Sequence, residues 1–308
     1  MIPGLNPANQ QFITSVENLN SQLSNTQVQL STGYRVNQAS DAPEEIGDIF
    51  ETRADLANVN QVTQNLNNVQ AQVNAGDSSV QAAIQVLQSA ITLGTQSASG
   101  TTSPAEFSSG ATEAQGLLAQ LVSLSNTQVN GVYIFSGDAS GSAPYQLDAT
   151  SPTGVDQLVT AQDTLQIADP TGLTFQIGQT AATLFDNSDA NGNPTPQNAF
   201  AAVNSLITAL QNSDTNGVSQ AISSLQSASD YLNGQLAFYG AAQNRISSAI
   251  DLASKFQVQY QTQLSNLVDT NVPAAALQLT QESTDISAAM SAESRRPTTT
   301  LFDYLPLG

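Results

Sequence analysis

The chain has 308 residues, enough for one large or two to three small domains, and only 10% of them are charged. Its 25 acidic and 6 basic residues give a formal net charge of −19, which excludes a basic nucleic-acid interface and attraction to an anionic membrane surface. Because Cys, His and Trp are absent, disulfides, Cys/His zinc sites and His- or Cys-dependent catalytic groups are excluded as well.

The spacing of apolar residues predicts a first helix near the start of the chain. Intervals of three and four residues, which place side chains on one helical face, separate Val16, Leu19, Leu23, Thr26 and Leu30. The segment 31–45 then interrupts the pattern. It predicts a structural turn formed by Gly33, Asn37, Asp41 and Pro43, with Asp41 expected as the cap of the next helix.

Further helices are predicted up to residue 130. One apolar stripe comprises Val59, Val62, Leu66, Val69 and Val73. Gly76 is expected to end that helix and Asp77 to cap the next, whose stripe is Val80, Ile84, Leu87 and Ile91. Pro104 is expected to open another helix, which carries Leu117, Leu118, Leu121 and Leu124.

Residues 131–198 have a different character. "GVYIFSG" (131–137) is β-branched and aromatic, and "TLQIAD" (164–169) and "LTFQIGQT" (173–180) alternate around a turn, which predicts a hairpin. The block contains seven Asp and no basic residue. It is therefore interpreted as a small, acidic, all-β outer domain that faces solvent.

The last third returns to helix. Apolar residues recur at heptad spacing from 232 to 267, which predicts a long seam. We expect the bundle seam to comprise Val59, Leu66, Val73, Leu232, Leu236, Tyr239, Ile246, Ile250, Tyr260 and Leu264. Pro273 is expected to interrupt this helix, and a last helix presents Ala276, Leu279, Ile286 and Met290.

These elements together predict a mainly α protein. Both chain ends supply a long antiparallel helical bundle or coiled coil, and a small all-β outer domain is inserted between them. The expected divisions are 1–45 (N-terminal helix and turn), 46–130 (first half of the bundle), 131–198 (outer β domain), 199–270 (second half) and 271–308 (C-terminal helix and apolar tail). Periodicity alone leaves a generic coiled-coil spacer open.

The sequence offers little support for catalysis, a metal or a cofactor. An acidic run of Asp41, Glu44, Glu45, Asp48, Glu51 and Asp55 has metal-like spacing, but a solvated helix face explains it better. "DANGN" (189–193) lacks the acidic residue that closes a calcium loop and is interpreted as a surface turn. We therefore expect no enzyme activity, no cofactor and no metal.

Three segments carry a resemblance to a known family. "QLSNTQVQLSTGYRVNQASDAPEEIG" (22–47) has a helix, a Leu-Ser-Thr-Gly turn and a Val-Asn…Ser-Asp stretch, in which Ala42 replaces a usual second Asp. "NGVYIFSGDAS" (130–140) and "LFDYL" (301–305) add an outer-domain and a C-terminal motif, although Pro306 to Gly308 extend past the usual end. The chain resembles the bacterial flagellins and, within that superfamily, the hook-associated protein 3 family.

The resemblance implies a structural axial protein of the flagellum, an adaptor between hook and filament. It implies export through the flagellar type III channel without a cleaved signal peptide, an extracellular location, and terminal helices that line a tube and fold when subunits stack. The implied partners are copies of the chain in a ring or tube, a neighbouring hook-associated protein and flagellin, with no nucleic acid and no membrane. The implied assembly interface is Val16, Leu19, Leu23, Leu30, Leu279, Ile286, Met290, Leu301, Phe302, Tyr304 and Leu305.

Three alternatives stay open at this point. The chain could be flagellin itself, the filament subunit, or a non-flagellar secreted adhesin or spacer. The apolar tail, which we interpret as an assembly contact and a candidate docking site for an export chaperone, could instead fold back onto its own helices.

Overall fold

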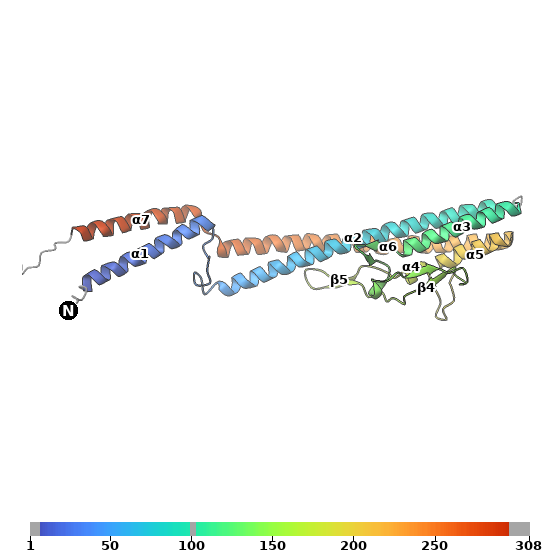
Figure 1. Ribbon diagram of the computed structural model, residues 1–308, viewed down its shortest axis with the longest axis horizontal. Coiled ribbons are helices and arrows are strands. Elements are labelled where there is room, and N and C mark those ends of the chain that lie inside the picture. Colours follow the sequence, from blue (N-terminus) through green and yellow to red (C-terminus); the bar gives the residue numbers. More distant parts are fainter. Residues whose placement is uncertain (1–6, 99–102, 296–308) are drawn as a thin grey trace, which may run out of the picture. The chain divides into compact units, whose positions relative to one another are not determined.

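The computed structural model describes residues 7–98 and 103–295 of the chain. By internal contacts the chain forms two compact units, one made of residues 1–58 with 256–308 and the other of residues 59–255. Helices make up most of both units (Figure 1). The predicted fold class, a mainly α protein with helices from both ends and a small strand-rich insertion, is confirmed.

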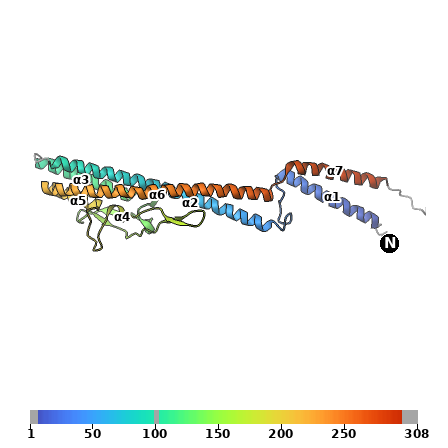
Figure 2. The same cartoon turned by 180° about the vertical axis from the view of Figure 1, so that it is seen from behind.

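Two helices that are distant in sequence, α1 (Pro7–Thr32) and α7 (Val272–Ser294), lie side by side in the first unit (Figures 1 and 2). Gly33 ends α1 with a positive φ of 78°, as the turn predicts. The cap of α7 is Asn271, whose side chain accepts a hydrogen bond from the Ala274 amide, and Pro273 fits the first turn. The first unit also contains the start of α2 and the end of α6.

The helix α2 (Ile46–Ser97) is continuous, which contradicts the predicted stop at Gly76 and cap at Asp77. Gly76 is required for a different reason. A Cβ atom there would lie 2.6 Å from Cε1 of the Tyr239 ring on α6 (Thr215–Val268). The glycine therefore permits close packing of two long helices instead of ending one of them.

Two shorter helices complete the helical part of the second unit. The helix α3 (Pro104–Ser125) begins with a capping box, in which Ser103 and Glu106 each bind the other's backbone amide. It packs against α5 (Ala199–Gln211), which Asn198 caps (Figure 2). The start of α3 at Pro104 was predicted, and α5 lies within the block that was expected to return to helix.

The strand-rich region consists of three antiparallel two-stranded sheets. The pairs are β1 (Gln128–Val129) with β2 (Val132–Tyr133), β3 (Tyr145–Leu147) with β4 (Val155–Gln157), and β5 (Gln166–Ala168) with β6 (Thr174–Gln176). The hairpin predicted around Gly172 is confirmed. A 3₁₀ turn, η1 (Gly137–Ala139), and a short helix, α4 (Ala181–Phe185), also lie in this region and were not predicted.

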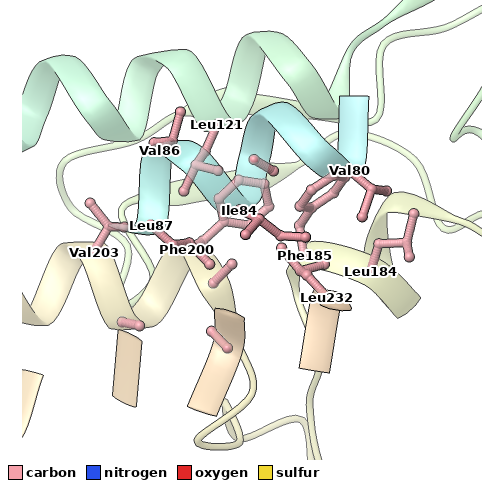
Figure 3. Packing of buried hydrophobic residues seen from close by; sticks show 14 of the residues in the cluster. Val80, Ile84, Val86, Leu87, Leu121, Leu184, Phe185, Phe200, Val203 and Leu232 are labelled. Carbon is pink, nitrogen blue, oxygen red and sulfur yellow. The ribbon is translucent and has the colours of Figure 1, made fainter. Parts of the chain in front are cut away.

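One apolar core holds the second unit together (Figure 3). Leu87 of α2, Leu121 of α3, Phe200 of α5 and Leu232 of α6 are fully buried in it, and Phe185 of α4 joins them from the strand-rich region. Each such side chain contributes roughly 1.5–3 kcal/mol through burial. The strand-rich region is thus part of this unit's core.

Candidate assembly site

The α1–α7 pair brings together most of the residues expected in the assembly interface. Its seam follows heptad-like intervals on both helices, and most of its side chains are half-buried. From α1 it takes Phe12, Val16, Leu19, Leu23, Thr26 and Leu30, and from α7 it takes Ala275, Leu279, Glu282, Ile286 and Ala289. Because α1 ends where α7 begins, the helices are antiparallel.

A polar contact lies in the middle of this apolar seam. Thr26 and Glu282 are only 3% and 6% exposed. The Thr26 hydroxyl donates to Glu282 Oε1 at 3.2 Å, and Gln278 Nε2 donates to the same oxygen at 2.8 Å. Glu282 Oε2 is buried and has no hydrogen-bond partner among the described residues. A buried carboxylate without a basic partner is unfavourable for stability, so this position calls for an explanation.

The structure divides the residues expected on the face of α7. Leu279 and Ile286 lie in the seam, whereas Met290 is 58% exposed and points away from it. Two further apolar side chains of α7, Val272 and Leu277, are also exposed. The role of these residues as contacts between copies stays a prediction.

A second feature of this unit is a tie between the α1–α2 connection and the segment where α6 ends and α7 begins, which we call the clasp and define as residues 33–45 with 267–271. The amides of Arg35 and Val36 donate to the Val268 carbonyl at 2.7 and 3.3 Å, and the Thr270 amide donates to the Gly33 carbonyl at 2.9 Å. Val36, Ala42, Ile49 and Val268 form a small buried cluster beneath these bonds, against which Leu264 and Leu267 pack.

Arg35 anchors the clasp with its side chain. The guanidinium donates to the Leu267 carbonyl at 2.6 Å and forms an ion pair with the Glu45 carboxylate. Glu45 belongs to the acidic run of the sequence, so this carboxylate serves the clasp. Within residues 7–98 and 103–295 no group of three acidic side chains could hold a metal ion.

The predicted turn residues lie in the clasp, but Asp41 does not cap α2. Its Oδ2 accepts from the amides of Asn37 and Gln38 at 2.9 and 2.8 Å. The side chain thus closes the turn that precedes it in sequence and does not bind the first turn of α2. Asn37 Nδ2 in turn donates to the Tyr34 carbonyl. α2 begins only at Ile46, because Ala42 is drawn into the buried cluster and Pro43 and Glu44 form a further turn.

The expected bundle-seam residues lie in both units. Those buried in the second unit are Val59, Leu66, Val73, Leu232, Tyr239 and Ile246, while Leu236 and Ile250 pack at its margin. Tyr260 and Leu264 are half-buried in the first unit. The tail residues Leu301, Phe302, Tyr304 and Leu305 lie outside the described residues.

The strand-rich region contains a half-buried acidic group around Asp186. Tyr145 Oη donates to Asp186 Oδ2 at 3.0 Å, and Asn198 Nδ2 donates to Oδ1 at 2.7 Å. Burial raises the pKa of Asp186, while the bonds from Asn198 and Tyr145 oppose that change. Burial and the neighbouring carboxylate raise the pKa of Tyr145. The group links β3, the end of α4 and the start of α5 through hydrogen bonds.

Exposed aspartates close the turns of the same region. Asp169 Oδ1 accepts from the amides of Thr171 and Leu173, and Asp189 Oδ1 accepts from those of Asn191 and Asn193. These bonds lower the pKa of both carboxylates. The "DANGN" carboxylate is thus used by its own backbone, as the interpretation as a surface turn requires.

Sequence reasoning missed several residues of this site. Glu282 lies three residues after Leu279 and four before Ile286, but its carboxylate interrupts the apolar pattern and was not predicted in the seam. Arg35 and Glu45 carry no signal that links them to Leu267, which is more than 200 positions away. Among the described helices, none is long and apolar enough to cross a membrane.

Comparison with known proteins gives the site a context. Residues 5–140 match the family model of the bacterial flagellin N-terminal helical region. Flagellar hook-associated protein 3 of Salmonella typhimurium is 29% identical over 192 residues, which cover 57% of this chain and 59% of that relative. The chain therefore matches less than two thirds of the length of this curated relative.

Solved structures show the same fold. A protein of Vibrio parahaemolyticus described as a flagellar hook-associated protein aligns with a TM-score of 0.64 at 16% identity, over 74% of this chain and all of that one. The flagellar junction protein FlgL of Legionella pneumophila aligns with a TM-score of 0.55 at 14% identity, over 65% of this chain and 99% of that one. Residues 5–140 thus resemble a flagellin N-terminal helical region, the 192 aligned residues resemble flagellar hook-associated protein 3 in sequence, and the solved structures share the fold.

Proposed function

We propose that this chain is a structural axial protein of the bacterial flagellum and forms the junction between hook and filament. The observation that carries the proposal is the pairing of α1, inside the flagellin-like region, with α7 from the other end of the chain. The names of its relatives, a hook-associated protein 3 and a flagellar junction protein, support the same role.

The proposed mechanism is mechanical. Two helices that pair along a narrow seam bury little surface, whereas ordering their backbones costs about 1–2 kcal/mol per residue, so further burial against neighbouring copies would stabilise the pair. Ile13 and Val28 of α1 and Val272, Leu277 and Met290 of α7 remain exposed in the single chain. Copies of the chain arranged in a ring or tube would cover these side chains.

The proposal assigns roles to the parts of the chain. Residues 1–45 and 271–308 supply the inner, stacking contacts, including the tail residues Leu301, Phe302, Tyr304 and Leu305. Residues 46–130 and 199–270 form the bundle, and the acidic block 131–198 faces solvent. The neighbours in the flagellum are another hook-associated protein on one side and flagellin on the other.

Export and chemistry follow from the same proposal. The chain leaves the cell unfolded through the flagellar export channel, needs no cleaved signal peptide, and functions outside the cell. An export chaperone binds the apolar tail before assembly. The role is structural, so the chain acts without catalysis, cofactor or metal.

The experiment that tests the proposal is localisation on intact flagella. A gold-labelled antibody against residues 131–198 is expected to mark one band at the outer end of the hook in electron micrographs. Label along the whole filament would identify a flagellin, which the flagellin N-terminal match keeps as the second candidate. Absence of label from flagella would contradict both and reopen the secreted adhesin or spacer.

A further inference from the structure

The helix α7 carries two overlapping apolar stripes, and the structure uses the less apolar one. The stripe in contact with α1 is Ala275, Leu279, Glu282, Ile286 and Ala289. A rotation of α7 by less than a quarter turn would keep Leu279 and Ile286 and bring in Val272, Ala276, Ser283 and Met290.

Apolar burial alone favours the rotated stripe. In the observed position Val272 and Met290 stay 51% and 58% exposed, while the seam buries an acidic side chain. The sequence accordingly predicted Met290 on the same apolar face as Leu279 and Ile286. Some other interaction must hold α7 in its observed rotation.

The hydrogen bond from the Thr26 hydroxyl to Glu282 Oε1 crosses this seam. We infer that Thr26 and Glu282 are positioning residues, which set the rotation of α7 against α1 and keep Val272 and Met290 on the outer surface. Polar residues inside an otherwise apolar helical seam are known to specify how helices pair at a cost in stability. The inference concerns the chain itself and does not depend on the proposed place in the flagellum.

The surroundings of Glu282 explain why one hydroxyl matters. Among the described residues, the only other donor to the Glu282 carboxylate is Gln278. Gln278 lies on the same helix, so its hydrogen bond is the same in either rotation of α7. Thr26 is the donor from α1, and Oε2 has no partner in the same part of the chain. Without the Thr26 hydroxyl, Glu282 would be buried without a hydrogen-bond donor from α1. A rotation of α7 that moves the Glu282 carboxylate toward water then becomes favourable.

The test uses the absence of native cysteine. Leu19 lies seven residues before Thr26, and Ala289 lies seven residues after Glu282, so in antiparallel helices the two positions face each other. A disulfide between Leu19→Cys and Ala289→Cys reports the observed orientation of α7. A disulfide between Leu19→Cys and Met290→Cys reports the rotated orientation. The rates of disulfide formation in the full chain are compared in three backgrounds: native, Thr26→Val and Thr26→Ser.

In the native background the disulfide to position 289 is expected to form several-fold faster than the disulfide to position 290. The isosteric Thr26→Val, which lacks the hydroxyl, should shift this preference several-fold toward position 290, and Thr26→Ser should leave it unchanged. An unchanged preference in Thr26→Val, or an equal shift in Thr26→Ser, would overturn the inference. Equal slowing of both disulfides in Thr26→Val would also overturn it, because the contact would then hold the pair together without setting its rotation.

Discussion

Single residues in the second unit show how closely its elements pack. Gly76 lies in the middle of α2 with the Tyr239 ring where a side chain would be. Glycine weakens a helix interior by roughly 0.5–1 kcal/mol relative to alanine. The close packing of α2 against Tyr239 therefore has to stabilise the unit by more than the glycine destabilises the helix.

Gly76→Ala is expected to lower the free energy of unfolding of residues 59–255 by about 1–2 kcal/mol. Overpacking against a buried ring costs about 1–3 kcal/mol, which exceeds the gain in helix propensity. Gly234→Ala is the matched control, because Gly234 lies in α6 and a methyl group there would meet no atom of another element within 4 Å. Urea unfolding should show stabilisation for Gly234→Ala, and equal stabilisation for Gly76→Ala would contradict the close packing of α2 against Tyr239.

Asp186 gives the second unit a pH-dependent contribution to stability. Its folded-state pKa is raised above the ordinary 3.8, so the stability it contributes is fully present below that value and is lost as pH rises through the folded-state pKa. The exposed turn aspartates have lowered pKa values and act in the opposite direction. The contribution of Asp186 to the pH dependence of stability is therefore measured as the difference in unfolding free energy between the native chain and a variant at this position.

Asp186→Asn should gain stability relative to the native chain as pH rises from about 4 to 7. The asparagine keeps hydrogen-bonding capacity toward Tyr145 and Asn198 without a charge to bury. Asp156→Asn, on an exposed position of β4, controls for the removal of one negative charge. Thermal unfolding across this pH range checks the prediction, and a stability difference that falls or stays constant for Asp186→Asn would contradict it.

Among the elements, the clasp ties the connection between α1 and α2 to the connection between α6 and α7. Its backbone bonds are partly exposed and its buried cluster is small. Arg35 links the first connection to the last turn of α6 with its bond to the Leu267 carbonyl. The ion pair with Glu45 adds less, since both side chains are partly exposed to water.

Arg35→Met should lower the free energy of opening the clasp by about 1–3 kcal/mol, mainly because the Leu267 carbonyl loses its charged donor. Hydrogen exchange of the Val36 and Thr270 amides should accelerate. Arg53→Met removes an equal charge from an exposed position of α2 in the same unit and should leave these amides unchanged. Equal acceleration in both variants would mean that overall charge, and not the clasp, governs the exchange.

Several elements could be predicted from the sequence because local signals determine them. Pro104 after Ser103, Gly172 in a turn, and the heptad spacing around Leu232 each specify their element without distant contacts. The helix end predicted at Gly76 was wrong, because the glycine is needed to make room for the ring of Tyr239, which is far away in sequence. Asp41 does not cap α2 because its carboxylate accepts from the Asn37 and Gln38 amides instead.

The candidate site was predictable in part for the same reason. Periodicity identified Leu19, Leu23, Leu279 and Ile286, which do lie in the α1–α7 seam. It could not identify Glu282, because its burial depends on one hydroxyl from a helix 256 positions away. Long-range polar contacts leave no local trace in the sequence.

For the molecule as a whole, we expect the chain ends to supply the contacts for assembly. Deletion of residues 301–308 should leave the far-ultraviolet circular dichroism of the monomer nearly unchanged and abolish incorporation into flagella. The reason is that each buried apolar side chain contributes roughly 1.5–3 kcal/mol only where a neighbour covers it. A large loss of monomer stability would show instead that the tail folds back onto its own helices.

Our main proposal is that α1–α7 pairs join copies of this chain at the hook–filament junction. Electron cryomicroscopy of isolated hook–filament junctions is the decisive test, because it locates the chain and its contacts together. We predict a single ring of this chain between hook and filament, with the α1–α7 pairs of adjacent copies in contact. A chain that repeats along the filament, or copies that touch only through residues 59–255, would refute the proposal.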